Sequence, residues 1–233
     1  MEQFYELEHI GVADSRLYAG GQWCNDTRQR CSTCNGFMEI TEPNEVRIEL
    51  NHLGQRGFVE YLWNSHSGPI FRADLVSLWQ LAGLTGFDLK PVRIVGWRGK
   101  PRKSLPDNIP IYYWLKTISK ARLAEPPPVE APCSDCGAIR YGFPSLGTHL
   151  SNGMRIEPGS WDGADFFGLQ DYYFVFCTRR AAEITLAAGY NRHIAFVRVE
   201  NHGRWQEFNI RDWTPKAYSE YMETFLIRRV QDL

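Results

Sequence analysis

The chain has 233 residues, of which 43% are hydrophobic, 23% charged and 14% aromatic. This composition is typical of a globular protein with its own core, so a chain that is disordered throughout is excluded. The longest apolar runs have about six residues, whereas a membrane-spanning helix needs about 20. A transmembrane protein is therefore excluded as well.

The formal net charge is −1, yet the charges are unevenly distributed along the chain. Residues 1–50 contain nine acidic and four basic side chains, whereas residues 93–123 contain eight basic side chains and one acidic one. Such asymmetry indicates either a charged partner or two solvated faces that attract each other within the fold. The N-terminus is acidic and lacks the apolar block of an export signal, so we expect a cytoplasmic protein.

Residues 1–150 are predicted to form an N-terminal region in which two cysteine turns flank a large insertion. Apolar and charged residues alternate over residues 45–50, which indicates a strand with one buried face. Apolar residues recur at three- and four-residue steps over residues 71–82, which predicts a helix that ends at Gly83. A further strand is predicted over residues 92–97.

A basic loop, residues 98–103, follows this last strand and is a candidate contact surface. Further along, Pro126, Pro127, Pro128 and Pro132 form a stiff, extended lead to the second cysteine turn. A proline-rich lead of this kind is a spacer rather than a flexible tether between domains. The basic side chains of the loop are Arg98, Lys100, Arg102 and Lys103.

Residues 151–233 are predicted to form a C-terminal strand–helix–strand region with a final helix. The predicted order is a buried strand over residues 171–177, a helix over 178–188 that Thr178 caps, and a strand over 194–199. The final helix begins at Thr214 and Pro215. It would place four large side chains on one face: Tyr218, Tyr221, Met222 and Phe225.

Four of the six cysteines form two Cys-x-x-Cys turns, the first with Cys31 and Cys34 and the second with Cys133 and Cys136. This spacing lets both thiols of a turn reach one ion at about 2.3 Å, the length of a zinc–sulfur bond. Two such turns supply the four ligands of a tetrahedral metal site. Gly137 follows the second pair, and Asn35 with Gly36 follows the first. These residue types accept a left-handed backbone, which lets amide hydrogens turn toward a thiolate.

Two other uses of these cysteines are open, namely disulfides and a thioredoxin-like redox pair. Disulfides are rare in a reducing cytoplasm, and a redox pair would begin a helix, whereas neither turn is followed by a helical pattern. We therefore predict one structural zinc ion per chain, held by the four turn cysteines. Cys24 is interpreted as a core or spare cysteine and Cys177 as a buried one. The predicted fold is α+β, with mixed sheets, a few helices and two halves joined by this zinc-ribbon-like site.

Several stretches of the chain resemble one protein family. They are the two cysteine turns about a hundred residues apart, the Phe4–Tyr5 pair, a Gly/Trp/Asn segment before the first turn, and residues 161–167 leading into residues 174–176. In these features the chain resembles the double-CXXCG-motif paralogues of myxobacteria, some of which are immunity proteins. The first turn departs from the motif, because Asn35 precedes its glycine. The resemblance implies a small cytoplasmic protein that binds zinc and inactivates a cognate toxin by binding it.

Two binding functions follow from these observations. An immunity-type protein would cover the toxin's active site or block its assembly, and the many aromatics suit a rigid contact surface. A basic toxin would favour the acidic N-terminal segment as the contact, whereas an acidic toxin would favour the basic loop. The alternative is a zinc-ribbon nucleic-acid binder that stacks bases on Trp97 beside the basic loop. The near-zero net charge counts against this alternative.

No enzymatic activity is predicted. The residues that suggest catalysis are His149, His193 and His202, together with Asp162 and Asp165. No histidine pair has metal-ligand spacing on a helix, and the chain has no nucleophile elbow or phosphate-binding glycine loop. Asp165 is expected to cap or pair locally. An ion held by four thiolates has no open position for a substrate, which is typical of a structural site.

Overall fold

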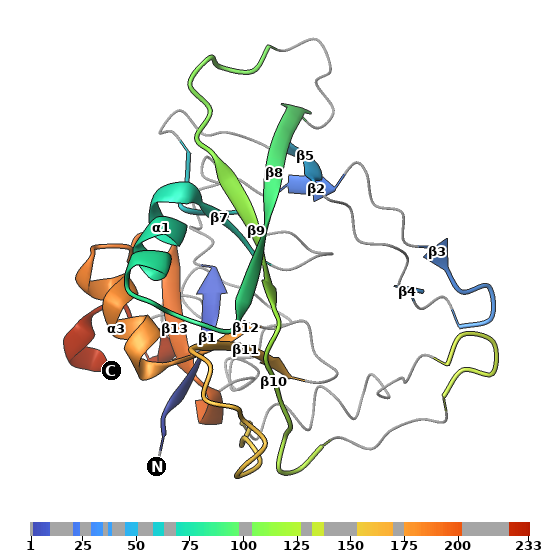
Figure 1. The fold of residues 1–233 in the computed structure, drawn as a ribbon, viewed down its shortest axis with the longest axis vertical. Coiled ribbons are helices and arrows are strands. Elements are labelled where there is room, and N and C mark those ends of the chain that lie inside the picture. The colour runs from blue at the N-terminus through green and yellow to red at the C-terminus, as the bar shows by residue number, and fades with distance from the viewer. Residues whose placement is uncertain are drawn as a thin grey trace.

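The computed structural model describes residues 2–9, 21–23, 29–34, 37–38, 45–50, 58–62, 69–97, 104–126, 132–137, 153–169, 175–201 and 224–233. These residues form two mixed β-sheets, one small two-stranded sheet and two α-helices (Figure 1). The predicted α+β class is therefore confirmed. Two 3-10 helices, Val199–Asn201 and Val230–Asp232, complete the described elements.

The five-stranded sheet consists of β1 (Phe4–His9), β10 (Lys120–Ala121), β11 (Phe166–Leu169), β12 (Val175–Thr178) and β13 (Ile194–Arg198). Its order is β10-β11-β12-β1-β13, and β1 is antiparallel to both of its neighbours. Strands β12 and β13 are consequently parallel to each other, and α3 (Arg179–Ala187) connects them. This is the predicted strand–helix–strand unit, into which the first strand of the chain is inserted.

The six-stranded sheet consists of β2 (Gly21–Trp23), β5 (Val46–Leu50), β6 (Tyr61–Leu62), β7 (Ile70–Arg72), β8 (Phe87–Trp97) and β9 (Tyr112–Thr117). Its order is β2-β5-β8-β9-β7-β6, and only the β5–β8 pair is parallel. Strand β5 buries alternate residues, which confirms the predicted strand with one buried face.

Strand β8 includes the strand predicted over residues 92–97 but begins earlier, at Phe87. The missed part contains Pro91, and a proline within a run of residues argues against a central strand because it cannot donate a ladder hydrogen bond. Pro91 is tolerated because β8 pairs only with β9 at this point, since the pairing with β5 begins at Val92.

The first predicted helix is shorter than its sequence pattern. Helix α1 spans Ala73–Leu81, whereas the pattern predicts a helix over residues 71–82. Phe71 lies instead in β7, which is hydrogen-bonded to both β6 and β9, so the chain stays extended through Arg72. Gly83 has a φ of 64° directly after the helix, as expected of a residue that ends it.

Helix α3 begins and ends where the sequence predicts. The hydroxyl of Thr178 accepts a hydrogen bond from the amide of Ala181, so Thr178 is the N-cap residue. Gly189 has a φ of 86° after the last turn.

No helix in the described part of the chain is long and apolar enough to cross a membrane.

Parts of three predicted features lie outside the described residues. They are residues 171–174 of the predicted buried strand, the basic loop over residues 98–103, and the final helix over residues 214–223. Phe225, which the pattern places on the apolar face of that helix, is described and buried.

Aromatic rings connect the two sheets. Trp79 of α1 lies between Phe71 of the six-stranded sheet and Phe166 of the five-stranded sheet, with ring centroids 4.9 and 4.8 Å away. Its indole Nε1 donates to Thr185 Oγ1 of α3 at 2.8 Å. All four side chains are fully buried. Aromatic pairs of this kind add about 0.5–1.5 kcal/mol beyond the burial of their area, so α1 holds both sheets in one core.

The turn between α1 and β8 also approaches the other sheet closely. The amide of Phe166 donates to the carbonyl of Thr85 at 2.9 Å. Gly86 has a φ of 92°, and a Cβ atom built on it would lie 1.9 Å from the carbonyl oxygen of Phe166. Only glycine fits here, because both the backbone conformation and the contact exclude a side chain.

We expect Gly86→Ala to lower the free energy of unfolding by about 3 kcal/mol or more, because backbone strain adds to a clash between the sheets. Gly83→Ala is the matched control, since Gly83 also has a positive φ but has nothing within 4 Å of its Cβ position. Its expected cost is about 1–2 kcal/mol. Urea unfolding curves measure both variants, and equal costs would contradict the close approach.

One side-chain hydrogen bond between the sheets joins two buried residues, Glu60 and His193. Glu60 directly precedes β6, and His193 directly precedes β13. His193 Nδ1 donates to Glu60 Oε2 at 2.6 Å, and the two side chains are 7% (His193) and 9% (Glu60) exposed. Burial raises the pKa of Glu60, but the hydrogen bond from His193 and the charge of Arg72 outweigh it, so the net pKa lies below 4.5.

We expect Glu60→Gln to cost about 1–3 kcal/mol of stability at pH 7, because a neutral amide replaces the charged acceptor of a buried hydrogen bond. The folded-state pKa of Glu60 is lowered, so its contribution exists above about pH 4.5 and is lost as the pH falls through the folded-state value. The variant should therefore lose less stability on acidification than the parent protein. Urea unfolding at several pH values measures this difference.

Glu45→Gln provides the control for this experiment. Glu45 pairs with Arg47 at 3.1 Å on the surface, where the two side chains are exposed. Surface pairs contribute about 0–1 kcal/mol. A similar cost for both substitutions would contradict the structural role of the buried pair.

Candidate metal centre

The first cysteine turn is the tip of a hairpin. Strands β3 (Gln29–Arg30) and β4 (Phe37–Met38) are antiparallel, with Gln29 opposite Met38 and Arg30 opposite Phe37. Cys31 directly follows β3, and the turn runs on to Cys34. The hairpin thus brings both thiols of this turn to the same end of a two-stranded ribbon.

The second cysteine turn is closed by a glycine. Gly137 has a φ of 69°, and its amide donates to the carbonyl of Cys133 at 2.8 Å. The left-handed backbone predicted after the second turn is therefore confirmed. The corresponding Asn35 and Gly36 of the first turn lie outside the described residues.

Backbone amides of the second turn point at a thiol. The amides of Asp135 and Cys136 donate to the sulfur of Cys133 and lower the pKa of this thiol to about 7. Amide donors have this effect because they stabilise the thiolate, which is the form that binds metals. The turn is thus built to favour a metal ligand at Cys133.

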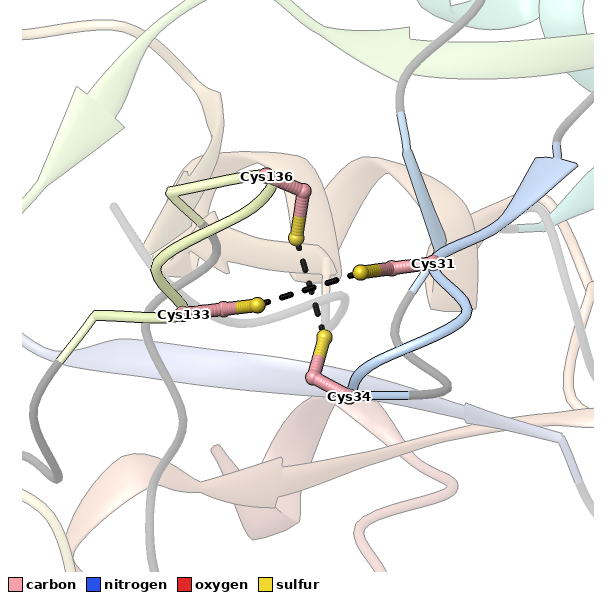
Figure 2. A group of neighbouring side chains, drawn as sticks. All are labelled: Cys31, Cys34, Cys133 and Cys136. Atoms are coloured by element: carbon pink, nitrogen blue, oxygen red, sulfur yellow. Dashed lines mark hydrogen bonds between the residues drawn. The ribbon is translucent and has the colours of Figure 1, made fainter.

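The structure brings all four turn cysteines together, as predicted. Their sulfur atoms lie within 4.8 Å of one another, and Figure 2 shows them converging on a common centre from two chain segments. The distance between the Sγ atoms of Cys31 and Cys133 is 3.8 Å, and that between Cys34 and Cys136 is 3.6 Å. In a zinc tetrahedron with bonds of about 2.3 Å, the sulfur atoms are about 3.8 Å apart.

The same distances exclude a disulfide among these four cysteines, because a disulfide bond is about 2.05 Å long. All four are free thiols. Four soft sulfur donors in a tetrahedral arrangement suit zinc or another thiophilic metal. The cluster can therefore hold a metal ion, and its donor set fits the predicted structural zinc.

The two turns are related by an approximate twofold arrangement. Each contact joins residues 102 positions apart, as in the two sulfur pairs and in the hydrogen bond that Thr33 Oγ1 donates to Asp135 Oδ2. Thr33 and Asp135 occupy the same position within their turns. The sequence analysis did not predict this contact. The signal for it was that both turns have the same Cys-x-x-Cys spacing, so that equivalent positions can face each other.

The centre lies beside the core of the protein. Cys31 and Cys34 are 4% and 7% exposed, yet neither belongs to one of the three apolar clusters formed by the described residues. Figure 1 shows β3, β4 and the yellow-green second turn on the side opposite the helices. We call residues 29–34, 37–38 and 132–137 the cysteine lobe.

Cys177 does not join the centre. Cys177 is fully buried in β12, as predicted, and burial raises the pKa of its thiol far above the ordinary range. A protonated thiol without access to solvent is a poor nucleophile. Cys24 lies outside the described residues, as do His149 and His202.

The remaining polar candidates have structural partners. The Asp162 carboxylate accepts from the hydroxyl of Ser119 at 2.6 Å. Asp165 was expected to pair locally, but it accepts from Arg180 of α3 at 2.9 Å and from the amide of Thr85 at 3.1 Å. These partners are not local in sequence. Asp165 directly precedes β11, and this point of the chain lies beside the turn after α1. His193 is the buried partner of Glu60 described above.

No protein-family model matches the chain, and a search of the curated proteins finds no match. The assignment of a metal centre therefore rests on the geometry and chemistry of the four thiols.

We expect the purified protein to contain about one metal ion per chain, and Cys31→Ser or Cys133→Ser to reduce this content to near zero. Cys177→Ala is the matched control and should keep the metal, because Cys177 is remote from the cluster in a separate apolar core. Elemental analysis after gel filtration measures the content. Full metal content in Cys133→Ser, or metal loss in Cys177→Ala, would show that the ligand set is wrong.

Proposed function

We propose that this chain is an immunity-type binding protein, which neutralises a cognate bacterial toxin in the cytoplasm by direct binding and carries one structural zinc ion. The observation that carries the non-enzymatic role is the convergence of four thiols on one centre. Four sulfur ligands fill the coordination sphere of a tetrahedral ion, so neither water nor substrate has an open position.

The rest of the described chain supports a binding role over a catalytic one. Each histidine or aspartate that suggested catalysis and is described has a structural partner, with His193 on Glu60, Asp162 on Ser119 and Asp165 on Arg180. The four cysteines lie beside a two-sheet core rather than within it. Such a molecule is suited to presenting a surface.

The aromatic residues support the binding role through the core and not, as expected, through the contact surface. They were expected to form the contact surface, but the exposed large hydrophobic side chains among the described residues include no aromatic ring. The rings build the core between the sheets and make the scaffold rigid, which lowers the entropic cost of binding. The exposed set consists of Leu81, Val95, Ile111, Ile118 and Val230.

The toxin as partner comes from the resemblance to the double-CXXCG-motif family. That resemblance rests largely on the two cysteine turns, which meet in space as a shared metal site requires. The Phe4–Tyr5 pair belongs to the inserted strand β1, where Tyr5 is fully buried. The quoted motifs therefore include residues that build the fold as well as the metal ligands.

The alternative function, a zinc-ribbon nucleic-acid binder, has less support. It requires Trp97 to stack on a base, but Trp97 is 6% exposed and its Nε1 donates to the carbonyl of Ser104 at 3.1 Å. A buried indole offers no face to a base. The basic loop that would contact phosphates lies outside the described residues.

Co-expression with the product of the neighbouring gene tests the proposal. We expect a stable one-to-one complex on gel filtration, and growth of cells that the partner alone would kill. A partner-free protein that retains nucleic acid, with an affinity that falls steeply with salt concentration, would instead support the alternative. Growth arrest despite co-expression of this chain would contradict the immunity function.

A further inference from the structure

The four thiols of the centre are shielded unequally from solvent. Cys31 and Cys34 of the first turn are buried, whereas Cys133 and Cys136 of the second turn are half-buried. The two residues between the second pair, Ser134 and Asp135, are exposed. Ser32 and Thr33 between the first pair are exposed as well. The difference lies in the thiols themselves, and those of the second turn are the more accessible to a small solute.

Each sulfur of the second turn has a sulfur of the first turn as a close neighbour. The pairs are Cys31 with Cys133 at 3.8 Å and Cys34 with Cys136 at 3.6 Å (Figure 2). The hydrogen bond between Thr33 and Asp135 holds the two turns face to face. A disulfide formed along either sulfur contact would join the two turns, because each contact pairs one cysteine from each turn. The two sulfur atoms would need to approach by less than about 2 Å to form the bond.

We propose that peroxide converts this centre from a metal link into a covalent one, by forming the cross-turn disulfides Cys31–Cys133 and Cys34–Cys136 and releasing the metal. The inference rests on the proposed metal centre and concerns its regulation. The oxidant is hydrogen peroxide, and no protein partner is required.

The chemistry takes place in two displacements. A thiolate of the second turn attacks one oxygen of peroxide, so that an S–O bond forms, the O–O bond breaks and hydroxide leaves. The neighbouring sulfur of the first turn then attacks the sulfenic sulfur, so that the S–S bond forms, the S–O bond breaks and a second hydroxide leaves. Solvent protons convert the two hydroxides into water. Two thiolates lose two electrons, and one peroxide gains them.

The first disulfide removes two of the four thiolate ligands. A metal ion held by only the two remaining thiolates would dissociate. The second pair then reacts in the same way. Zinc itself is not redox-active, so the change occurs wholly on the sulfur atoms.

The consequence is that the two turns stay linked in two of three states. Metal links them in the reduced protein, and disulfides link them after oxidation. Only the reduced, metal-free protein leaves these segments, 102 positions apart, without a link through sulfur. Oxidation would therefore preserve the cysteine lobe rather than open it, whereas a disulfide within one turn would open it.

Peptide mapping of the peroxide-treated full-length protein tests the inference. We expect non-reducing mass spectrometry to find peptides of the first turn linked to peptides of the second, with one metal ion released per chain as measured with a zinc indicator dye. Reductant and zinc should restore the original state. Disulfides within the turns, or peroxide treatment that leaves the thiols free, would overturn the proposal.

Two further measurements separate this proposal from the metal assignment. Protein that is isolated without metal but still forms the cross-turn links would disprove the metal centre and support the cross-turn chemistry. Limited proteolysis should cleave the reduced, metal-free lobe at least about tenfold faster than the oxidised one, because an open segment is the protease substrate. Equal cleavage of both forms would contradict the covalent link. Cys177→Ala is the control and should behave as the parent protein.

Discussion

Four sulfur atoms within 4.8 Å of one another impose the constraint on which the functional account depends. In the thiolate form that binds metals they would repel one another, and a cation at their centre offsets that repulsion. With a cation in place, the protein would fill all four coordination positions, so a substrate would have no open position on the metal. Such closure supports the proposed role as a binding protein.

The two-sheet body supplies a second, separate source of stability. Trp79 of α1 packs on rings from both sheets, and Gly86 lets the turn after α1 approach β11 closely. The Glu60–His193 pair joins the ends of two edge strands within this body. None of these contacts involves the cysteine lobe. The molecule thus combines a body stabilised by apolar burial with a separate cysteine lobe, and under the two proposals only the lobe would respond to metal and oxidant.

Local signals in the sequence were sufficient for several features. The spacing within the cysteine turns identified the four thiols that meet, because two turns of that geometry leave one arrangement around an ion. The cap at Thr178 and the alternation over residues 45–50 likewise depend on neighbouring residues only. Long-range features were not predictable in the same way. The spacing of apolar residues placed Phe71 in a helix. Its actual place in β7 depends on pairing with β6 and β9, which the local sequence pattern does not reveal. Glu60 and His193, 133 positions apart, carry no pattern that marks them as partners.

X-ray absorption spectroscopy of the purified protein at the zinc edge identifies the atoms bound to the metal and so decides whether the four turn cysteines hold it. We expect four sulfur neighbours at about 2.3 Å and no nitrogen or oxygen neighbour. A bound water or imidazole would mean an open or different site and would contradict the structural role. Protein without any metal, and with its four turn thiols free, would contradict the centre itself.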